Sequence, residues 1–237
     1  MKRIHQTSLT VLLVVVAVLN ATSESLAQSA PKWARFERVR YIRSETRRNL
    51  ALEKAILRSL PNYREELRRI HEYDPSVVPT YIVRYFYNRV DLNDDGKLET
   101  LVWLHSALVG GSSGYTAQIY RSGKEGYRLL WEGTPAWNPV IVSGRKTRGW
   151  RNLIMLVAGG GVRPGYWIEA RFAGQSYPSS SRDGVEIKKS RIAGRAFIAD
   201  DWWSGFKGIE LRPPDLGVKL RATFNRQHNK VLQLMAR

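Results

Sequence analysis

The spacing of apolar residues changes along the chain and predicts two kinds of structure. Between residues 34 and 75 apolar residues recur every three or four positions, which is the period of one helix face. They form two stripes on either side of Pro61: Leu52, Ile56 and Leu60, then Tyr63, Leu67 and Ile70. We expect a pair of helices here, because proline fits the first turn of a helix. We favour two helices that pack on the domain with their basic faces in solvent, and a basic surface that lies on an anionic membrane or envelope polymer is the alternative.

From Thr80 the period falls to two, which is typical of a strand. The residues after Thr80 alternate through Tyr87, and many of them are aromatic. Later apolar runs, separated by glycine-containing turns, predict strands at 98–105, 115–121 and 127–132. Strands in this order, joined by short turns, indicate an antiparallel meander.

The meander is followed by a second stretch with a similar order of elements. A strand is expected to begin at residues 139–142, and apolar strands follow at 153–157 and 166–172, with a glycine-rich loop between them. We therefore expect an α+β fold, in which the N-terminal helical pair precedes an antiparallel β-meander of two similar units over residues 80–177, propeller-blade-like or sandwich-like. Residues 178–237 are expected to form a polar excursion, an aromatic segment, an edge strand at 218–224 and a basic tail.

The first 27 residues have the pattern of a secretory signal peptide. Lys2 and Arg3 precede a short apolar core, and small residues occupy the cleavage positions that end at Ala27. The core is far shorter than the roughly 20 residues that a membrane-spanning helix needs. We expect export, cleavage near Ala27, a polar linker at residues 28–33, and a soluble periplasmic or extracellular chain without a transmembrane segment.

The charge balance points to an anionic partner. The formal net charge is +17, and removal of Lys2, Arg3 and Glu24 with the signal would leave +16. We expect the partner to be an anionic envelope polymer or membrane surface, or an envelope protein. Nucleic acid fits the charge, but the export signal argues against it. The chain has no cysteine, which excludes disulfides, thiol chemistry and cysteine metal sites.

Residues 91–99 carry the most specific chemistry in the sequence. Asp91, Asn93, Asp95 and Glu99 place side-chain oxygens at positions 1, 3, 5 and 9 of a loop, with Gly96 at position 6. Ca²⁺ takes about six to eight oxygen ligands, and glycine permits the positive φ of a sharp turn. The sequence therefore predicts a Ca²⁺ site. A β-turn held by side-chain hydrogen bonds of Asx type is the alternative.

This segment resembles the calcium loops of FG-GAP and integrin-type β-propeller repeats, and the first half of an EF-hand or dockerin loop. An EF-hand has a bidentate acid at position 12, which is Val102 here, so the short form with an acid at position 9 is the better match. More broadly, residues 50–177 are similar to uncharacterised bacterial exported proteins with a single such loop. The resemblance implies no activity. It implies four side-chain ligands and one main-chain ligand. The main-chain ligand is the carbonyl oxygen of Lys97, and the side-chain ligands are Asp91, Asn93, Asp95 and Glu99.

Signals of catalysis are few. Residues 110–114 satisfy the G-x-S-x-G pattern, but a nucleophile elbow leads into a helix and a strand is expected here. His105 ends a predicted strand, and a structural role is expected for it. We predict a non-enzymatic protein. The alternative is a hydrolase acting on an envelope glycan through Asp200 and Asp201, beside Trp202 and Trp203, although adjacent residues on a strand face opposite sides.

Overall fold

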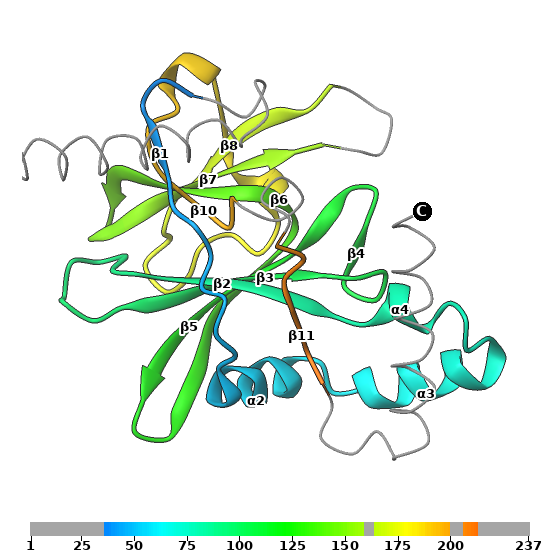
Figure 1. The fold of residues 1–237 in the computed structure, drawn as a ribbon. Coiled ribbons are helices and arrows are strands. Elements are labelled where there is room, and N and C mark those ends of the chain that lie inside the picture. The colour runs from blue at the N-terminus through cyan, green and yellow to red at the C-terminus, as the bar shows by residue number, and fades with distance from the viewer. Residues whose placement is uncertain (1–35, 159–163, 200–205, 213–237) are drawn as a thin grey trace, which may run out of the picture.

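Two β-sheets stack face to face, and three helices cover the outer face of one of them (Figure 1). The computed structural model describes residues 36–158, 164–199 and 206–212. The expectation of a β-rich, antiparallel fold with few helices is confirmed. None of the helices in these ranges is long and apolar enough to cross a membrane.

The first sheet has the strand order β11–β2–β3–β5–β6, and all of its neighbouring strands are antiparallel. Its strands are β2 (Arg84–Val90), β3 (Glu99–His105), β5 (Gly114–Gly123), the first part of β6 (Gly126–Thr147) and β11 (Ile209–Glu210), with the short β4 (Gly110–Gly111) paired to the start of β5. The acidic segment at residues 91–98 is the connection between β2 and β3.

The second sheet has the order β1–β10–β6–β7–β8–β9. Its other strands are β1 (Val39–Tyr41), β7 (Trp150–Val157), β8 (Tyr166–Ala170), β9 (Val185–Ile187) and β10 (Gly194–Phe197), with short 3₁₀ helices η2 (Ser181–Asp183) and η3 (Lys189–Arg191) beside β9. Strand β6 belongs to both sheets, because it pairs with β5 up to Ala136 and with β7 from Trp137 onward. The Asn138–Pro139 peptide bond in this crossing is cis.

The main core lies between the two sheets. The alternation along β2 sends Phe86 and Val90 to this side, where they join apolar residues of β3, β5, β6, β7 and β8. Trp103 is fully buried here, and its indole nitrogen donates a hydrogen bond to the Ala136 carbonyl oxygen at 3.0 Å. Strand β3 is buried at every position except the last, because one of its faces packs against the second sheet and the other against the helices.

The helices pack on the opposite face of the first sheet. They are α2 (Leu50–Ser59), α3 (Tyr63–Tyr73) and α4 (Val78–Tyr81). Asn49 caps α2, because its side chain accepts a hydrogen bond from the Leu52 amide at 3.0 Å. Leu52 and Ile56 are buried against the sheet residues that alternate with the inner core, among them Tyr85. The buried Glu53 carboxylate accepts a hydrogen bond from the Tyr85 hydroxyl at 2.7 Å.

The helical region predicted for residues 34–75 begins too early. Residues 39–41 form β1, which runs parallel to β10, and the first described helix starts at Leu50. The strand predicted from Thr80 starts only at Arg84, because residues 78–81 form α4 with Pro79 in its first turn. At residues 39–41, pairing with the distant strand β10 overrides the local helical pattern. At residues 78–81, Pro79 favours a helical turn over the strand pattern.

Two further predictions for the β part are wrong. The strands expected at 127–132 and 139–142 are parts of the single strand β6, which continues because its partner changes from β5 to β7. The polar excursion expected at the start of residues 178–237 is not irregular, because residues 178–195 contain β9 and the start of β10, which occupy sheet positions beside β8 and β6. The signal peptide, the linker at 28–33, the Asp200–Trp203 segment and the strand predicted at 218–224 lie outside the described residues.

Candidate functional site

The acidic loop between β2 and β3 is organised around the carboxylate of Asp91. One of its oxygens accepts hydrogen bonds from the amides of Asn93 at 3.2 Å and Asp94 at 2.6 Å. The other accepts a hydrogen bond from the Gly96 amide at 2.9 Å. Gly96 has φ +79°, as its position in the turn predicts. The side chain of Asp91 therefore holds the loop closed by bonding to its main chain.

Asn93 and Asp95 lie beside each other in the same loop. The Asn93 side-chain amide donates to an Asp95 carboxylate oxygen at 3.1 Å, and the Lys97 amide donates to the other oxygen at 2.8 Å. These two hydrogen bonds, the one from Lys97 first, hold the pKa of Asp95 below its ordinary value. The structure thus brings Asp91, Asn93 and Asp95 into one turn.

Glu99 is turned into the protein instead of toward the loop. Its side chain is fully buried, and one oxygen accepts a hydrogen bond from the Leu92 amide at 3.0 Å. The other oxygen accepts two from Arg121, from Nε at 2.9 Å and from Nη2 at 2.6 Å. Arg121 also lies 3.5 Å from an Asp95 oxygen. Its guanidinium sits over the ring of Trp150, 5.4 Å from the ring centroid. Arg121 is therefore one source of positive charge beside the acidic loop.

The hairpin between β6 and β7 also contacts the acidic loop. Lys146 forms an ion pair with Asp94, and Arg151 does so at 2.8 Å. The Arg151 amide donates to the Leu92 carbonyl oxygen at 2.7 Å. Hydrogen bonds from Lys146 and Arg151 lower the pKa of Asp94. The acidic loop of the first sheet is thus tied to a basic hairpin of the second sheet.

Sequence reasoning missed the role of Asp94 within the loop, and it missed Arg121, Lys146 and Arg151 as partners of the loop. A signal for two of them exists in the sequence. Residues 143–152 occupy the place of the acidic loop in the predicted second unit, and they are basic where residues 91–99 are acidic. Opposite charge in two corresponding loops favours a contact between them.

The fit of a calcium ion to this loop is partial. The oxygens of Asp91, Asn93 and Asp95, and the carbonyl group of Lys97, are the hard donors that Ca²⁺ prefers. Glu99 does not fit as arranged, because its side chain is fully buried and is paired with the Arg121 guanidinium. Across the described ranges, no group of three or more His, Cys, Asp or Glu side chains is arranged to hold a metal ion.

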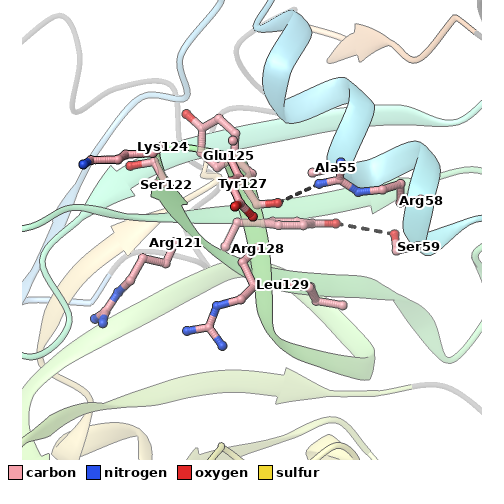
Figure 2. Close-up of a pocket in the computed structure, with 13 residues that line it drawn as sticks. Ala55, Arg58, Ser59, Arg121, Ser122, Lys124, Glu125, Tyr127, Arg128 and Leu129 are labelled. Carbon is pink, nitrogen blue, oxygen red and sulfur yellow. Dashed lines mark hydrogen bonds between the residues drawn. The ribbon is translucent and has the colours of Figure 1, made fainter.

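The hairpin of β5 and β6 carries a cross-strand pair of arginines. Arg121 on β5 is directly opposite Arg128 on β6. Figure 2 shows both side chains on the same side of the hairpin, with their guanidinium groups pointing away from α2. Arg121 has the Glu99 carboxylate as its partner. Arg128 is exposed and has no carboxylate partner among the residues that the structure describes.

A hollow of about 800 Å³ lies between the end of α2 and this hairpin (Figure 2). The Arg58 guanidinium donates to the Tyr127 carbonyl oxygen at 2.8 Å, so the charge of an α2 side chain is held at the hairpin. The charged residues of the lining are four basic ones and a single acidic one, namely Arg58, Arg121, Lys124, Arg128 and Glu125. The guanidinium groups of Arg121 and Arg128 lie on the face of the hairpin away from α2, so Arg58 and Lys124 are the cations that an anion in the hollow would meet.

His105 and the G-x-S-x-G segment at residues 110–114, the other candidates that lie in the described part of the chain, have structural surroundings. His105 packs against Tyr115, with ring centroids 4.3 Å apart, and burial lowers its pKa. The G-x-S-x-G segment turns from β4 into β5, so a strand follows it and the geometry of a nucleophile elbow is not formed.

Comparisons with known proteins give no relative to set beside this geometry. No protein-family model, curated protein or solved structure matches the chain.

Proposed function

We propose that the protein is an exported, non-enzymatic binding protein for an anionic component of the cell envelope. The hairpin of β5 and β6, together with the end of α2, forms its binding surface. Export is part of the proposal because of the signal-like pattern of residues 1–27. The α+β layout with two similar units is also part of it, supported by the meanders β2–β3–β5 and β6–β7–β8.

The arginine pair on the hairpin carries this proposal. Like charges directly opposite each other on neighbouring strands destabilise a sheet. Arg121 and Arg128 face each other in this way, with one buried carboxylate beside Arg121. An anion bound at Arg128 would offset the repulsion, and Arg58 adds positive charge on the α2 side of the same hairpin. The net charge of +17 raises the local concentration of any anionic ligand.

Titration with heparin, a sulfated and carboxylated polysaccharide, tests the binding. We expect binding at low ionic strength that weakens steeply as salt is added, because exposed charges are screened over about 10 Å at 0.1 M salt. Arg128→Gln should weaken binding, whereas Lys188→Gln, an exposed lysine beside η3, should leave it unchanged. Binding that does not respond to salt, or equal losses in the two variants, would contradict the proposal.

We further propose that the acidic loop binds one Ca²⁺ through Asp91, Asn93, Asp95 and the Lys97 carbonyl group, with Glu99 behind it. The turn that gathers the first three side chains supports this. A bound ion would supply a fixed positive charge that holds the turn beside the basic hairpin. Its stabilisation should reach about 2.7 kcal/mol at a hundredfold excess over the dissociation constant.

Thermal unfolding with and without calcium tests the metal proposal. We expect the melting temperature to rise with Ca²⁺ in the unaltered chain and not in Asp95→Asn, whose carboxylate charge is removed. Asp183→Asn, on η2, is the matched control and should keep the response. No heat on calorimetric titration and no change in melting temperature would remove the metal site.

A further inference from the structure

A second hollow adjoins the first on the other side of Arg58. It has a volume of about 640 Å³ and lies where the end of α2 meets the start of α3. Its basic lining residues are Lys54, Arg58, Arg64 and Arg68. Arg58 is shared, because it also lines the hollow beside the β5–β6 hairpin. The two hollows therefore meet at one side chain.

The second hollow also has an excess of positive charge. Its single acidic lining residue, Glu65, is paired with Arg69 at 2.6 Å, and Arg69 is not part of the lining. Lys54 is exposed and lies four residues before Arg58, so both side chains occupy one face of α2. No carboxylate partner of Lys54 is found in the described part of the chain. Arg68 is paired with Glu72 at 3.6 Å, so the positive charge that continues from the hairpin across α2 toward α3 is carried mainly by Arg58 and Lys54.

We propose that the two hollows form one binding track for a linear acidic glycan, with Arg58 at the junction. This inference rests on the proposed function and adds the class of ligand. A small anion reaches the charges of one hollow only. A chain with repeated carboxylate, sulfate or phosphate groups contacts cations of the hairpin, α2 and α3 at once, and gains affinity from each additional contact.

The lining favours a glycan over a nucleic acid or a membrane. Bases stack on exposed aromatic side chains, but Tyr63 and Tyr120 are buried, and Tyr127 is half-buried with its ring in edge contact with that of Tyr120. A membrane surface is bound through protruding apolar side chains. Both sites here are hollows, and the large apolar side chains of their linings are buried or half-buried except for Leu129, which is 39% exposed.

Calorimetric titration of the purified chain with heparin-derived oligosaccharides of defined length tests the track. We expect an octasaccharide to bind more tightly than a disaccharide. Lys54→Gln should weaken octasaccharide binding about two- to fivefold, the size expected for one exposed ion pair, and leave disaccharide binding at the hairpin unchanged. Arg58→Gln should weaken both. Lys188→Gln is the control for a lost exposed charge, and circular dichroism checks that each variant is folded.

The outcomes separate the track from the proposed function. Octasaccharide binding that is no tighter than disaccharide binding, or that is unaffected by Lys54→Gln, would overturn the track and leave anion binding at the hairpin intact. If neither oligosaccharide binds the unaltered chain at low salt, the track and the proposed function both fail. Tighter binding to a single-stranded DNA of equal charge, or to phosphatidylglycerol vesicles, would overturn the choice of a glycan.

Discussion

Removal of the charge on Glu99 should destabilise the protein by several kcal/mol. Glu99→Gln keeps the size of the side chain and keeps an oxygen that accepts the Leu92 amide. It removes the negative charge that pairs with Arg121 at 2.6 and 2.9 Å. Glu99 is fully buried, whereas the Arg121 side chain is 29% exposed. The substitution therefore leaves a partly buried cation without its main partner.

The expected loss in the free energy of unfolding is about 3 kcal/mol. Breaking a buried ion pair by removing one partner costs about 3–5 kcal/mol. The low end applies because Arg121 keeps some contact with water, with Asp95 at 3.5 Å and with the ring of Trp150. For a chain of this size that loss corresponds to a drop of roughly 6–12 °C in melting temperature.

Urea unfolding of three variants checks this reasoning. Glu125→Gln, an exposed position on the β5–β6 turn, is the matched control and should stay within about 0.5 kcal/mol of the unaltered chain. Arg121→Gln should cost more than Glu99→Gln, because it leaves the fully buried carboxylate unpaired. A loss below about 1 kcal/mol for Glu99→Gln, or a smaller loss for Arg121→Gln, would refute the clamp between Glu99 and Arg121.

Two further predictions concern the helix layer and the response to pH. Tyr85→Phe should lower the free energy of unfolding by about 1–3 kcal/mol, because the buried Glu53 carboxylate loses a donor. Tyr73, which is 91% exposed, is the control, and Tyr73→Phe should not change the stability. Equal effects of the two substitutions in urea unfolding would contradict this prediction. Burial lowers the pKa of His105, so the folded state favours the neutral ring. The contribution of His105 should be complete above its ordinary pKa of about 6.5 and fall as the pH drops below it. His105→Gln should flatten the stability profile between about pH 7.5 and pH 5, and an unchanged profile would count against the assignment.

The sequence allowed the elements with strong local patterns to be predicted. Strands β3, β5 and β7 combine apolar runs with glycine turns, and their positions agree with the structure to within a few residues. The start of α2 was missed although Asn49 is a good capping residue. Strands β1, β9 and β10 were missed for another reason. They are short, and pairing with distant strands holds them in place.

The acidic loop shows the same division between local and long-range information. Asp91, Asn93 and Asp95 lie within five residues, so their convergence follows from the turn itself. The ion pair of Glu99 with Arg121 spans 22 residues, and that of Asp94 with Arg151 spans 57. Such partners depend on strand register and on how the two sheets pack, which local spacing does not determine. The same applies to the arginine pair on the hairpin.

The most direct measurement of the central claim is the effect of Arg128→Gln on both stability and heparin binding. The account predicts opposite signs. The free protein should become slightly more stable, by about 0.2–0.5 kcal/mol, because the repulsion from Arg121 is removed, and its affinity for heparin should fall. A variant that binds heparin as tightly as the unaltered chain, or that is less stable than it, would contradict the assignment of this hairpin as an anion-binding surface.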